Sequence, residues 1–437
     1  MKSARKLFGT DGVRGAAGTF LTAEMATALG RATTATLAAE RPQVLIVRDT
    51  RESGPMLEAA LAAGIAAAGG DALLAGVLPT PAAAILVRRL GLDLAAVVSA
   101  SHNPFGDNGI KFFDGRGVKL ADQVEAEIEA QIESAPRADQ PGHVRELNGG
   151  LEDYLRELQA AFQIDLSGRR VVLDCANGAT FEAAPAIFER LGAEVETIGV
   201  EPDGRNINAG CGSTHIEALA ERVAASEAEI GFAFDGDGDR VLAVDGSGRV
   251  HDGDELIALA ARGMAGRGEL EGGVVVTVMS NYGFHQAMEA DGIEVAVTQV
   301  GDRYVIDEML RRNWKLGGEQ SGHIICSDFV TTGDGIAAAL MTMRELDGAQ
   351  LAEAAPMSKL PQVLVNVEVA DREAIADAAE VWEAVEAANA DLEGRGRVLL
   401  RPSGTEPLVR VMVEAPTDEE AGAVCQRLAD LVRRELS

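Results

Sequence analysis

The sequence predicts an α/β protein with mixed, mostly parallel sheets, followed by a smaller α+β domain. Short apolar runs with the length of buried parallel strands alternate with longer Ala- and Leu-rich runs of helical length over most of the chain. Aromatic residues make up only 4% of the 437 residues, so aliphatic side chains must fill the cores. Near the C-terminus the order changes to strand, helix, strand, strand, helix, which favours antiparallel pairing.

The first predicted unit covers residues 1–150. It opens with LFGTDGVRG, residues 7–15, in which three glycines around an acid and an arginine indicate either a loop that closely approaches another group or a surface turn. A polar stretch over 133–148 ends the unit. The elements expected between them are a helix over 22–40, a strand over 43–49, a helix over 55–69, a strand over 72–77, a helix over 81–89 and a strand over 94–98.

Two further units of similar size follow, over residues 151–251 and 252–362, and they hint at a repeat at the level of the fold. The alternation of strands and helices is the pattern of doubly wound layers with right-handed crossovers. The strands expected in these units are 170–175, 193–199, 228–234, 274–280 and 295–300. The helices expected there begin at or near residues 151, 181, 216, 254, 282, 302 and 334.

The last predicted domain covers residues 363–437. A strand over 363–371 and a helix over 374–388 precede the two strands GRVLLRPSG and LVRVMVEA and a helix from residue 418. Between the two strands lies RPSGTEP, residues 401–407. Arginine, serine and threonine around a glycine suit a phosphate clamp, with a plain hairpin turn as the alternative.

Composition and charge restrict the possible partners. A formal net charge of −30 argues against nucleic acid and anionic membrane surfaces, but not against a small phosphorylated molecule bound by local Arg or Lys residues. The four cysteines show no metal-ligand spacing and indicate free thiols in a reducing compartment. No signal-peptide core and no run of membrane-spanning length is present, so we expect a cytoplasmic protein.

The segment VVSASHNPFGDNGIKFF, residues 97–113, places a serine directly after a buried strand. Pro104 prevents the strand from continuing. A hydroxyl at the carboxyl end of such a strand lies where open α/β sheets bind ligands. Taken alone, a serine followed by a histidine is also compatible with a polar turn.

The segment DGDGDR, residues 235–240, follows the predicted strand over 228–234. Three carboxylates at alternate positions can converge only around a cation, because their mutual repulsion would otherwise be costly. An EF-hand loop is excluded, since Arg240 and Gly246 occupy the positions that require glycine and glutamate. A solvated acidic turn is the remaining alternative. The all-oxygen donor set favours magnesium.

The segment GGEQSGH, residues 317–323, combines a carboxylate, an amide, a hydroxyl and an imidazole between glycines. Such a set can form hydrogen bonds with the hydroxyls of a sugar, although a hairpin turn is the better explanation of this segment taken alone.

Five of these motifs closely resemble the α-D-phosphohexomutases in sequence and in their order along the chain, and together they span essentially the whole chain. They are residues 7–15, 97–113, 235–240, 317–323 and 401–407. The resemblance implies three α/β/α domains and a C-terminal domain around a central active-site cleft. It also implies that Ser101 is a phosphoserine that carries a transferable phosphoryl group and ligates the metal. The roles implied for other residues are catalysis for Arg14, His102 and Lys111, metal binding for Asp235, Asp237 and Asp239, and substrate binding for Arg240, Glu319, Ser321, His323, Arg401, Ser403, Gly404 and Thr405.

Within this family, PDGRNINAGCGSTH (residues 202–215) and GDRYV (residues 301–305) resemble the phosphoglucosamine mutase branch. This implies interconversion of glucosamine 6-phosphate and glucosamine 1-phosphate through a 1,6-bisphosphate, with one Mg²⁺ per subunit, for the synthesis of UDP-N-acetylglucosamine and cell-wall precursors. His102, Lys111 and His323 are the candidates for proton transfer. The alternatives are a phosphomannomutase/phosphoglucomutase, a phosphatase and a non-catalytic sugar-phosphate binding protein. A homodimer is an expectation from the family.

Overall fold

The structure is a computed structural model of the chain, and it describes residues 7–9, 11–403 and 407–436. The chain forms two compact units. The first unit combines Met1–Met279 with Ile293–Pro356, and the second combines Ser280–Gly292 with Met357–Ser437. Within the described residues, no helix combines the length and the apolar character that crossing a membrane requires. The four cysteines are free thiols.

A six-stranded mixed sheet occupies the N-terminal part of the first unit, as far as the described residues show. Its strand order is β1 (Val13–Ala16), β5 (Asp107–Asp114), β4 (Leu94–Val98), β2 (Gln43–Arg48), β3 (Asp71–Val77) and β6 (Val144–Glu146). The strands β4, β2, β3 and β6 are parallel neighbours, whereas β5 is antiparallel to both β4 and β1. The predicted strands over 43–49, 72–77 and 94–98 are thereby confirmed.

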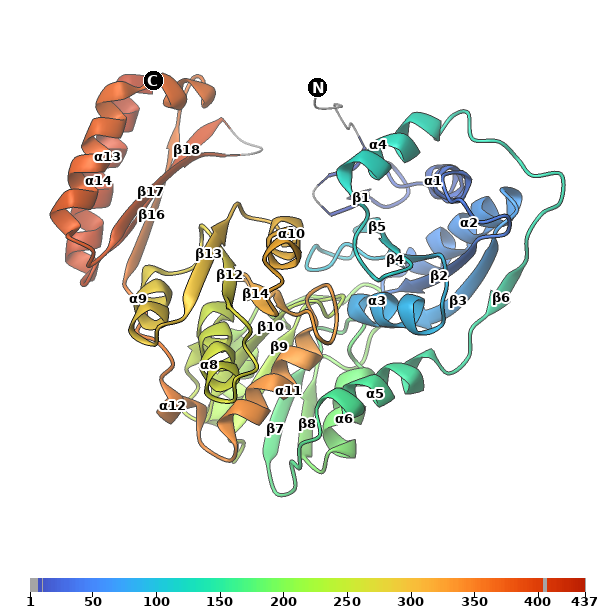
Figure 1. The fold of residues 1–437 in the computed structure, drawn as a ribbon, viewed down its shortest axis with the longest axis horizontal. Coiled ribbons are helices and arrows are strands. Elements are labelled where there is room, and N and C mark those ends of the chain that lie inside the picture. The colour runs from blue at the N-terminus through green and yellow to red at the C-terminus, as the bar shows by residue number, and fades with distance from the viewer. Residues whose placement is uncertain (1–6, 10, 404–406, 437) are drawn as a thin grey trace. The chain divides into compact units, whose positions relative to one another are not determined.

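Helices cover both faces of this sheet (Figure 1). The helices α1 (Ala23–Ala35), α2 (Gly54–Ala67) and α4 (Asp122–Gln131) contribute to one core with alternate residues of the sheet, such as Val44 and Ile46. The helix α3 (Thr80–Arg89) lies on the opposite face, where the intervening Leu45 and Val47 are also buried. Apolar side chains on both faces explain why β2 is a continuous hydrophobic run.

Two predictions for this part of the chain are wrong in detail. The segment 7–15, expected to be a loop, contains the start of β1, because Val13 pairs with Ile110 and its side chain is fully buried. The helix expected over 22–40 ends at Ala35, where the chain turns back toward β2.

The second and third sheets of the first unit repeat this plan within the described residues. The second has the order β11 (Val250–His251), β10 (Val241–Asp245), β9 (Ile230–Phe234), β7 (Arg170–Asp174) and β8 (Glu194–Ile198). The third has the order β13 (Glu294–Thr298), β12 (Gly273–Thr277), β14 (Leu316–Gly318) and β15 (Ile324–Cys326). The accompanying helices are α5 (Gly150–Ala161), α6 (Ala183–Arg190), α7 (Glu217–Ala224), α8 (Gly253–Gly266), α10 (Asp302–Arg312), α11 (Gly335–Leu346) and α12 (Leu351–Ala354).

All three sheets share one feature that bears on function. A strand with a parallel neighbour is followed directly by an antiparallel one, as in the pairs β4–β5, β9–β10 and β14–β15. The connections therefore begin at the carboxyl ends of β4, β9 and β14, the edge of an α/β sheet where ligands bind. The repeat proposed at the level of the fold is visible in this recurring hairpin.

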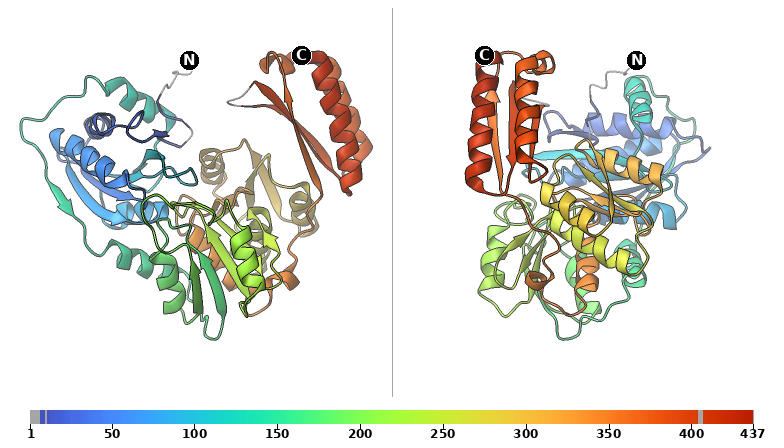
Figure 2. Two further views of the ribbon diagram at one scale, coloured as in Figure 1. Left: turned by 180° about the vertical axis from the view of Figure 1, so that it is seen from behind. Right: turned by 60° about the vertical axis from the view of Figure 1, so that its left-hand side comes forward.

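The second unit is an antiparallel sheet of β16 (Gln362–Glu368), β18 (Leu408–Glu414) and β17 (Arg397–Pro402), in that order. The helices α13 (Ala379–Leu392) and α14 (Asp418–Leu436) pack together against one face of this sheet, with the short helix η1 (Glu373–Asp377) nearby (Figure 2). The predicted order of strand, helix, strand, strand, helix is confirmed.

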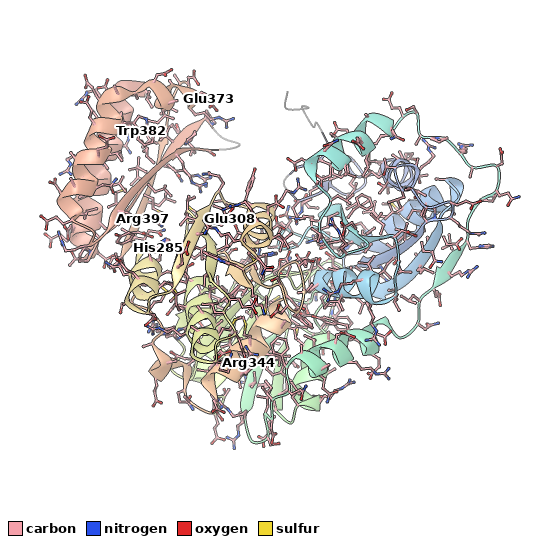
Figure 3. The ribbon with its side chains drawn as sticks, in the orientation of Figure 1. His285, Glu308, Arg344, Glu373, Trp382 and Arg397 are labelled. Carbon is pink, nitrogen blue, oxygen red and sulfur yellow. The ribbon has the colours of Figure 1, made fainter. Side chains whose placement is uncertain are left out.

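The helix α9 (Tyr282–Ala290) groups with the second unit, although its position in the chain is between β12 and β13. The Arg397 Nε donates to the Glu414 carboxylate over 2.7 Å, and the Tyr282 N–H donates to the same carboxylate over 2.9 Å. Burial and the nearby Arg397 lower the pKa of His285 to about 4, so this ring is neutral at physiological pH (Figure 3).

The domain boundaries at residues 150, 251 and 362 stay predictions.

A hydrogen bond between two buried side chains, a tyrosine and an aspartate, joins α5 to α11 in the first unit. The Tyr154 hydroxyl donates to the carboxylate of Asp334 at 2.9 Å, and Asp334 caps α11 by accepting from the Ala337 N–H at 2.9 Å. Burial raises the pKa of Asp334 to about 7. Since its unfolded pKa is about 3.9, the stability from this group is fully present below about pH 4 and is lost as the pH rises through about 7.

We therefore expect Asp334→Asn to change the pH dependence of unfolding. The neutral amide accepts the same hydrogen bonds but cannot ionise, so its stability relative to wild type should improve by about 3 kcal/mol between pH 5 and pH 8. The melting temperature should shift in favour of the variant by about 5 °C over that range. Thermal unfolding at both pH values measures this, with Asp165→Asn as an exposed control. A difference between variant and wild type that is the same at both pH values would contradict the assignment.

Candidate active site

The connections after β4, β9 and β14 contain three of the motifs identified in the sequence. They are residues 99–106, residues 235–240 and residues 319–323. Ser101 of the first segment donates to Asp235 of the second, and His323 of the third lies 3.7 Å from Asp239 of the second, so the structure brings the three segments together within the first unit. Each segment follows a strand buried on both faces, which fixes the direction in which its side chains emerge.

Ser101 lies just beyond the end of β4 and is almost completely buried. Its Oγ donates to Asp235 Oδ2 over 2.5 Å and lies 3.3 Å from His102 Nδ1. Its backbone N–H donates to the Ser99 hydroxyl over 2.9 Å. The serine hydroxyl therefore faces the acidic segment, with an imidazole beside it.

Asp235, Asp237 and Asp239 form a buried cluster in which one oxygen from each carboxylate lies within 4.8 Å of the others. The glycine between the first two aspartates makes the close approach possible. A Cβ on Gly236 would lie 2.5 Å from the carbonyl oxygen of Ser101, which no side chain tolerates. The alternation of aspartate and glycine thus lets the acidic segment pack directly on the serine.

The charges in this cluster are strongly coupled. Burial, together with the charges of Asp239 and Asp237, raises the pKa of Asp235 well above its ordinary value. Burial also acts to raise the pKa of Asp239, but Lys111 and His323 more than offset it, and the pKa lies below the ordinary value. A cluster that cannot hold three negative charges comfortably is one that a cation would stabilise.

The donor set fits a metal ion that prefers oxygen ligands. One carboxylate oxygen of Asp237 already accepts from Lys111 Nζ at 2.7 Å and from the Thr80 hydroxyl at 2.6 Å. The Oδ1 atoms of Asp237 and Asp239 are buried and accept no hydrogen bond in the described structure. Buried carboxylate oxygens without a donor are costly, and a divalent cation would satisfy them. The cluster can therefore bind one metal ion.

Two lysines and an arginine surround Asp11, which belongs to the first motif. Arg14 pairs with Asp11 and donates to the carbonyl of Ala100 at 3.3 Å, next to the serine. Lys119 pairs with Asp11 from the other side. Burial lowers the pKa of Lys111, but neighbouring carboxylates including Asp11 raise it by more, so this lysine stays protonated. Three cationic side chains thus gather around Asp11, and one of them, Arg14, reaches the residue before Ser101.

The third segment, residues 319–323, connects the antiparallel strands β14 and β15, so it is the hairpin turn that was the alternative interpretation of its sequence. The Glu319 carboxylate accepts from the Gly301 N–H over 3.0 Å, whereas Ser321 is exposed. Asp302, the next residue of the GDRYV motif, pairs with Lys119 over 2.5 Å. The branch-typical GDRYV motif is therefore linked through Lys119 to Asp11 of the first motif.

His323 and Arg240 adjoin the metal cluster from this side. The Nε2 atom of His323 accepts from the Gly333 N–H at 2.9 Å, and its Nδ1 lies 3.7 Å from Asp239 Oδ1. The backbone N–H of Arg240 donates to Asp235 over 3.2 Å, and its side chain is about a quarter exposed, at 27%. Of the two, Arg240 is the one with a cationic group still accessible to a ligand.

The RPSGTEP motif lies in the second unit, at the turn between β17 and β18. Arg401 is in β17, and Ser403 is buried with its N–H donating to Leu408 O over 2.8 Å. Gly404 and Thr405 lie outside the described residues. Arg401 is directly opposite Arg410 of β18, so two cations share one face of the sheet. Like charges directly opposite each other on neighbouring strands repel, and an anion bound beside them would offset that repulsion.

Several residues of the site escaped the sequence analysis. Arg51 and Asp49, directly after β2, form a fully buried ion pair below the serine segment. Thr80 holds Asp237, Lys119 joins Asp11 to Asp302, and Asn208 donates to Ser101 O over 2.9 Å. The one available signal was the charged sequence Asp-Thr-Arg at the end of a buried strand, where a turn has no need of two opposite charges.

Four family models match consecutive parts of the chain. The alpha/beta/alpha domains I, II and III of phosphoglucomutase/phosphomannomutase match residues 5–139, 152–248 and 252–362. The C-terminal domain of the same family matches residues 364–431.

Two curated relatives are similar over nearly the full length. The phosphoglucosamine mutase of Moorella thermoacetica is 53% identical, covering 95% of this chain and 96% of its own. That of Geobacillus kaustophilus is 49% identical, covering 99% of each chain.

Solved structures share the fold at lower identity. A phosphoglucomutase/phosphomannomutase family protein from Burkholderia thailandensis superposes with a TM-score of 0.82 at 24% identity, covering 100% of this chain and 99% of that one. The Aspergillus fumigatus N-acetylphosphoglucosamine mutase, solved in complex with GlcNAc-6P and magnesium, gives 0.71 at 20% identity, covering 100% and 97%.

Proposed function

The chain belongs to the phosphoglucomutase/phosphomannomutase family, and from this premise we propose that it is a phosphoglucosamine mutase. It is an isomerase that interconverts glucosamine 6-phosphate and glucosamine 1-phosphate. The observation that carries this conclusion is an identity of 46–53% over nearly the whole chain with enzymes of that name. Among the activities of the family, the proposed one is therefore the mutase reaction on glucosamine phosphates that the sequence predicts.

Ser101 is the residue that we propose as the carrier of the phosphoryl group. The buried hydroxyl at the end of β4 supports this role, since it donates to Asp235 of the acidic cluster over 2.5 Å and follows Ala100, whose carbonyl accepts from Arg14. In the first half-reaction the free hydroxyl oxygen of the sugar forms a bond to phosphorus as the bond from phosphorus to Ser101 Oγ breaks. The hydroxyl proton ends on Ser101 Oγ, and the product is the 1,6-bisphosphate. The second half-reaction is the reverse, with the other phosphate.

His102 is the best placed of the three candidates for proton transfer. Its Nδ1 lies 3.3 Å from Ser101 Oγ, and burial together with Arg240 and Arg14 lowers the pKa of the ring, so that it is neutral and able to accept a proton. Lys111 stays protonated and serves as a cation. His323 already uses Nε2 to accept a backbone hydrogen bond.

The metal ion that we propose is Mg²⁺, held by Asp235, Asp237, Asp239 and a phosphoryl oxygen on Ser101. The all-oxygen donor set and the two buried carboxylate oxygens without hydrogen bonds support it. When bound, the ion offsets negative charge on the transferring phosphoryl group. Lys111 contributes to the same end by orienting Asp237 and adding a fixed positive charge.

Substrate binding is proposed for two separate groups of residues. Arg240, Glu319, Ser321 and His323 form the proposed sugar side of the site. Arg401, Ser403, Gly404 and Thr405 form the proposed clamp for the phosphate that does not react, and the facing cations of β17 and β18 support an anion there. A phosphate clamp serves both half-reactions, because it recognises the phosphate and not the end of the sugar that bears it.

We propose that the protein works in the cytoplasm, which its four free thiols support, and the homodimer stays a prediction from the family.

A comparison of substrates tests the proposed function. The purified protein, activated with glucosamine 1,6-bisphosphate and Mg²⁺, is given the 6-phosphates of glucosamine, glucose and mannose side by side. We expect kcat/KM to be highest for the glucosamine compound by at least about tenfold, because a site built to bind an amino group rejects a hydroxyl in its place.

Other outcomes identify the alternatives. A preference for mannose or glucose would indicate a phosphomannomutase/phosphoglucomutase. Free phosphate released at the rate of turnover would indicate a phosphatase. Binding of sugar phosphate without turnover would indicate a non-catalytic binding protein.

A further inference from the structure

A single buried arginine gathers the backbone carbonyls of the serine segment. Arg51 is fully buried and follows β2. Its Nη2 donates to the carbonyl oxygens of Ser101 at 2.9 Å and Asn103 at 2.8 Å. Its Nη1 donates to the carbonyl oxygens of Asp107, at 3.0 Å, and Pro104. One guanidinium therefore binds four carbonyls from a stretch of seven residues, 101–107.

The arginine is itself held in place by the residues below the serine. Arg51 Nε donates to Asp49 Oδ2 at 2.8 Å, and the Ser99 hydroxyl donates to the same oxygen at 2.6 Å. The Ser99 hydroxyl in turn accepts from the Ser101 N–H at 2.9 Å. The chain of contacts from Arg51 through Asp49 and Ser99 thus returns to Ser101. A buried ion pair is a poor device for stability alone, which suggests that it fixes a specific conformation.

The conformation that it fixes is an unusual one. Ser101 has a φ of 52°, in the left-handed region that residues with a side chain rarely adopt. From the neighbouring α/β layer, Asn208 Nδ2 donates to the carbonyl oxygens of Ser101, at 2.9 Å, and Asn103, at 3.2 Å. The carbonyls of the segment are thereby directed inward, and the serine hydroxyl is directed toward Asp235.

We propose that Arg51 is a positioning residue for phosphoryl transfer: its guanidinium holds the backbone of residues 101–107 so that Ser101 Oγ keeps one place whether or not it carries phosphate. The inference rests on the proposed function. In-line transfer is sensitive to displacements of an ångström or less, so a loosened segment should slow the chemical step more than it weakens binding. Lysine should not replace this residue, since a single ammonium cannot reach four carbonyls spread around a planar fork.

The test uses the full-length chain with Arg51→Lys and Arg51→Ala, and with Arg88→Lys as matched control. Arg88 also donates to a backbone carbonyl, that of Phe329 at 2.8 Å, but lies at the end of α3. We expect kcat for Arg51→Lys to fall by at least about thirtyfold with KM changed less than about threefold. Millimolar guanidinium should raise the kcat of Arg51→Ala. Faster amide hydrogen exchange in residues 99–107 should accompany both changes.

The contrary outcomes are distinct. A folded Arg51→Lys variant with wild-type kcat and unchanged exchange would overturn the inference. So would a loss of activity that is fully explained by a smaller folded fraction, as judged by thermal unfolding. If Arg51→Ala does not fold, the lysine variant decides. A wild-type protein without mutase activity would overturn the proposed function, and an active wild type with an unimpaired lysine variant would overturn the role of Arg51 alone.

Discussion

Replacing Ser101 by alanine is expected to reduce turnover by at least about a thousandfold. The alanine removes the only protein atom that forms a covalent bond to phosphorus in the proposed mechanism. The neighbouring groups have other proposed roles. His102, beside the hydroxyl, is the proposed proton acceptor, and the carboxylates of the cluster are positioned to bind a cation. Sugar-phosphate binding should persist within about threefold, because the proposed clamp and sugar segments are unchanged. Steady-state kinetics and calorimetric titration measure the two effects.

The control for this variant is Ser167→Ala, an exposed serine far from the motifs in the chain. It should retain wild-type turnover. An alanine variant at 101 that keeps a substantial part of the mutase activity would show that the phosphoryl group travels by another route.

Asp237→Asn is expected to raise the Mg²⁺ concentration for half-maximal activity by at least about tenfold. The change keeps the shape of the side chain but removes one negative charge from the cluster. It also weakens the bonds from Lys111 Nζ, at 2.7 Å, and the Thr80 hydroxyl, at 2.6 Å, which hold the carboxylate in place. Activity measured over a range of Mg²⁺ concentrations, with direct Mg²⁺ titration of the folded variant, gives the shift.

Asp245→Asn is the matched control for the metal cluster. Asp245 is a buried aspartate at the end of β10, and it accepts from the Ser247 hydroxyl at 2.6 Å in a turn that carries no motif. Its substitution should affect stability and leave the Mg²⁺ dependence unchanged. Equal dependence on Mg²⁺ in Asp237→Asn and wild type would remove this cluster from the metal site.

Strands that are buried on both faces could be predicted from the sequence. The segments that form β2, β4, β7, β9 and β12 are continuous runs of mostly apolar residues, and such runs are typical of buried strands in parallel sheets. The antiparallel strand β1 was missed, because its sequence Val-Arg-Gly-Ala is short and contains glycine. Its strand conformation comes from pairing with β5, a contact across about a hundred residues that local propensity cannot reveal.

The candidate site could be predicted in part. The motifs gave Ser101 and the aspartates, and the structure brings these residues into direct contact. The role of Arg51 could not be found in this way, because its partners include backbone carbonyls, which leave no trace in residue types. Asn208 lies within the motif of residues 202–215, but its contact with the Ser101 carbonyl was hidden for the same reason. The engagement of His323 with Gly333 was equally hidden, since it depends on where two turns meet.

The mutase activity follows from relatives that are about half identical over nearly the whole chain. The assignment of roles to individual residues follows from contacts, burial and charge, and it is these roles that the variants test. Arg51 is not part of any motif, yet it contacts the proposed carrier Ser101 directly.

Whether Ser101 carries the phosphoryl group can be measured directly by mass spectrometry of the intact protein with peptide mapping. The purified protein is incubated with glucosamine 1,6-bisphosphate and then with glucosamine 6-phosphate. We expect one phosphoryl group on the peptide that contains Ser101, which glucosamine 6-phosphate removes as the bisphosphate appears and glucosamine 1-phosphate accumulates. A protein that turns over substrate while Ser101 never carries phosphate would contradict this expectation.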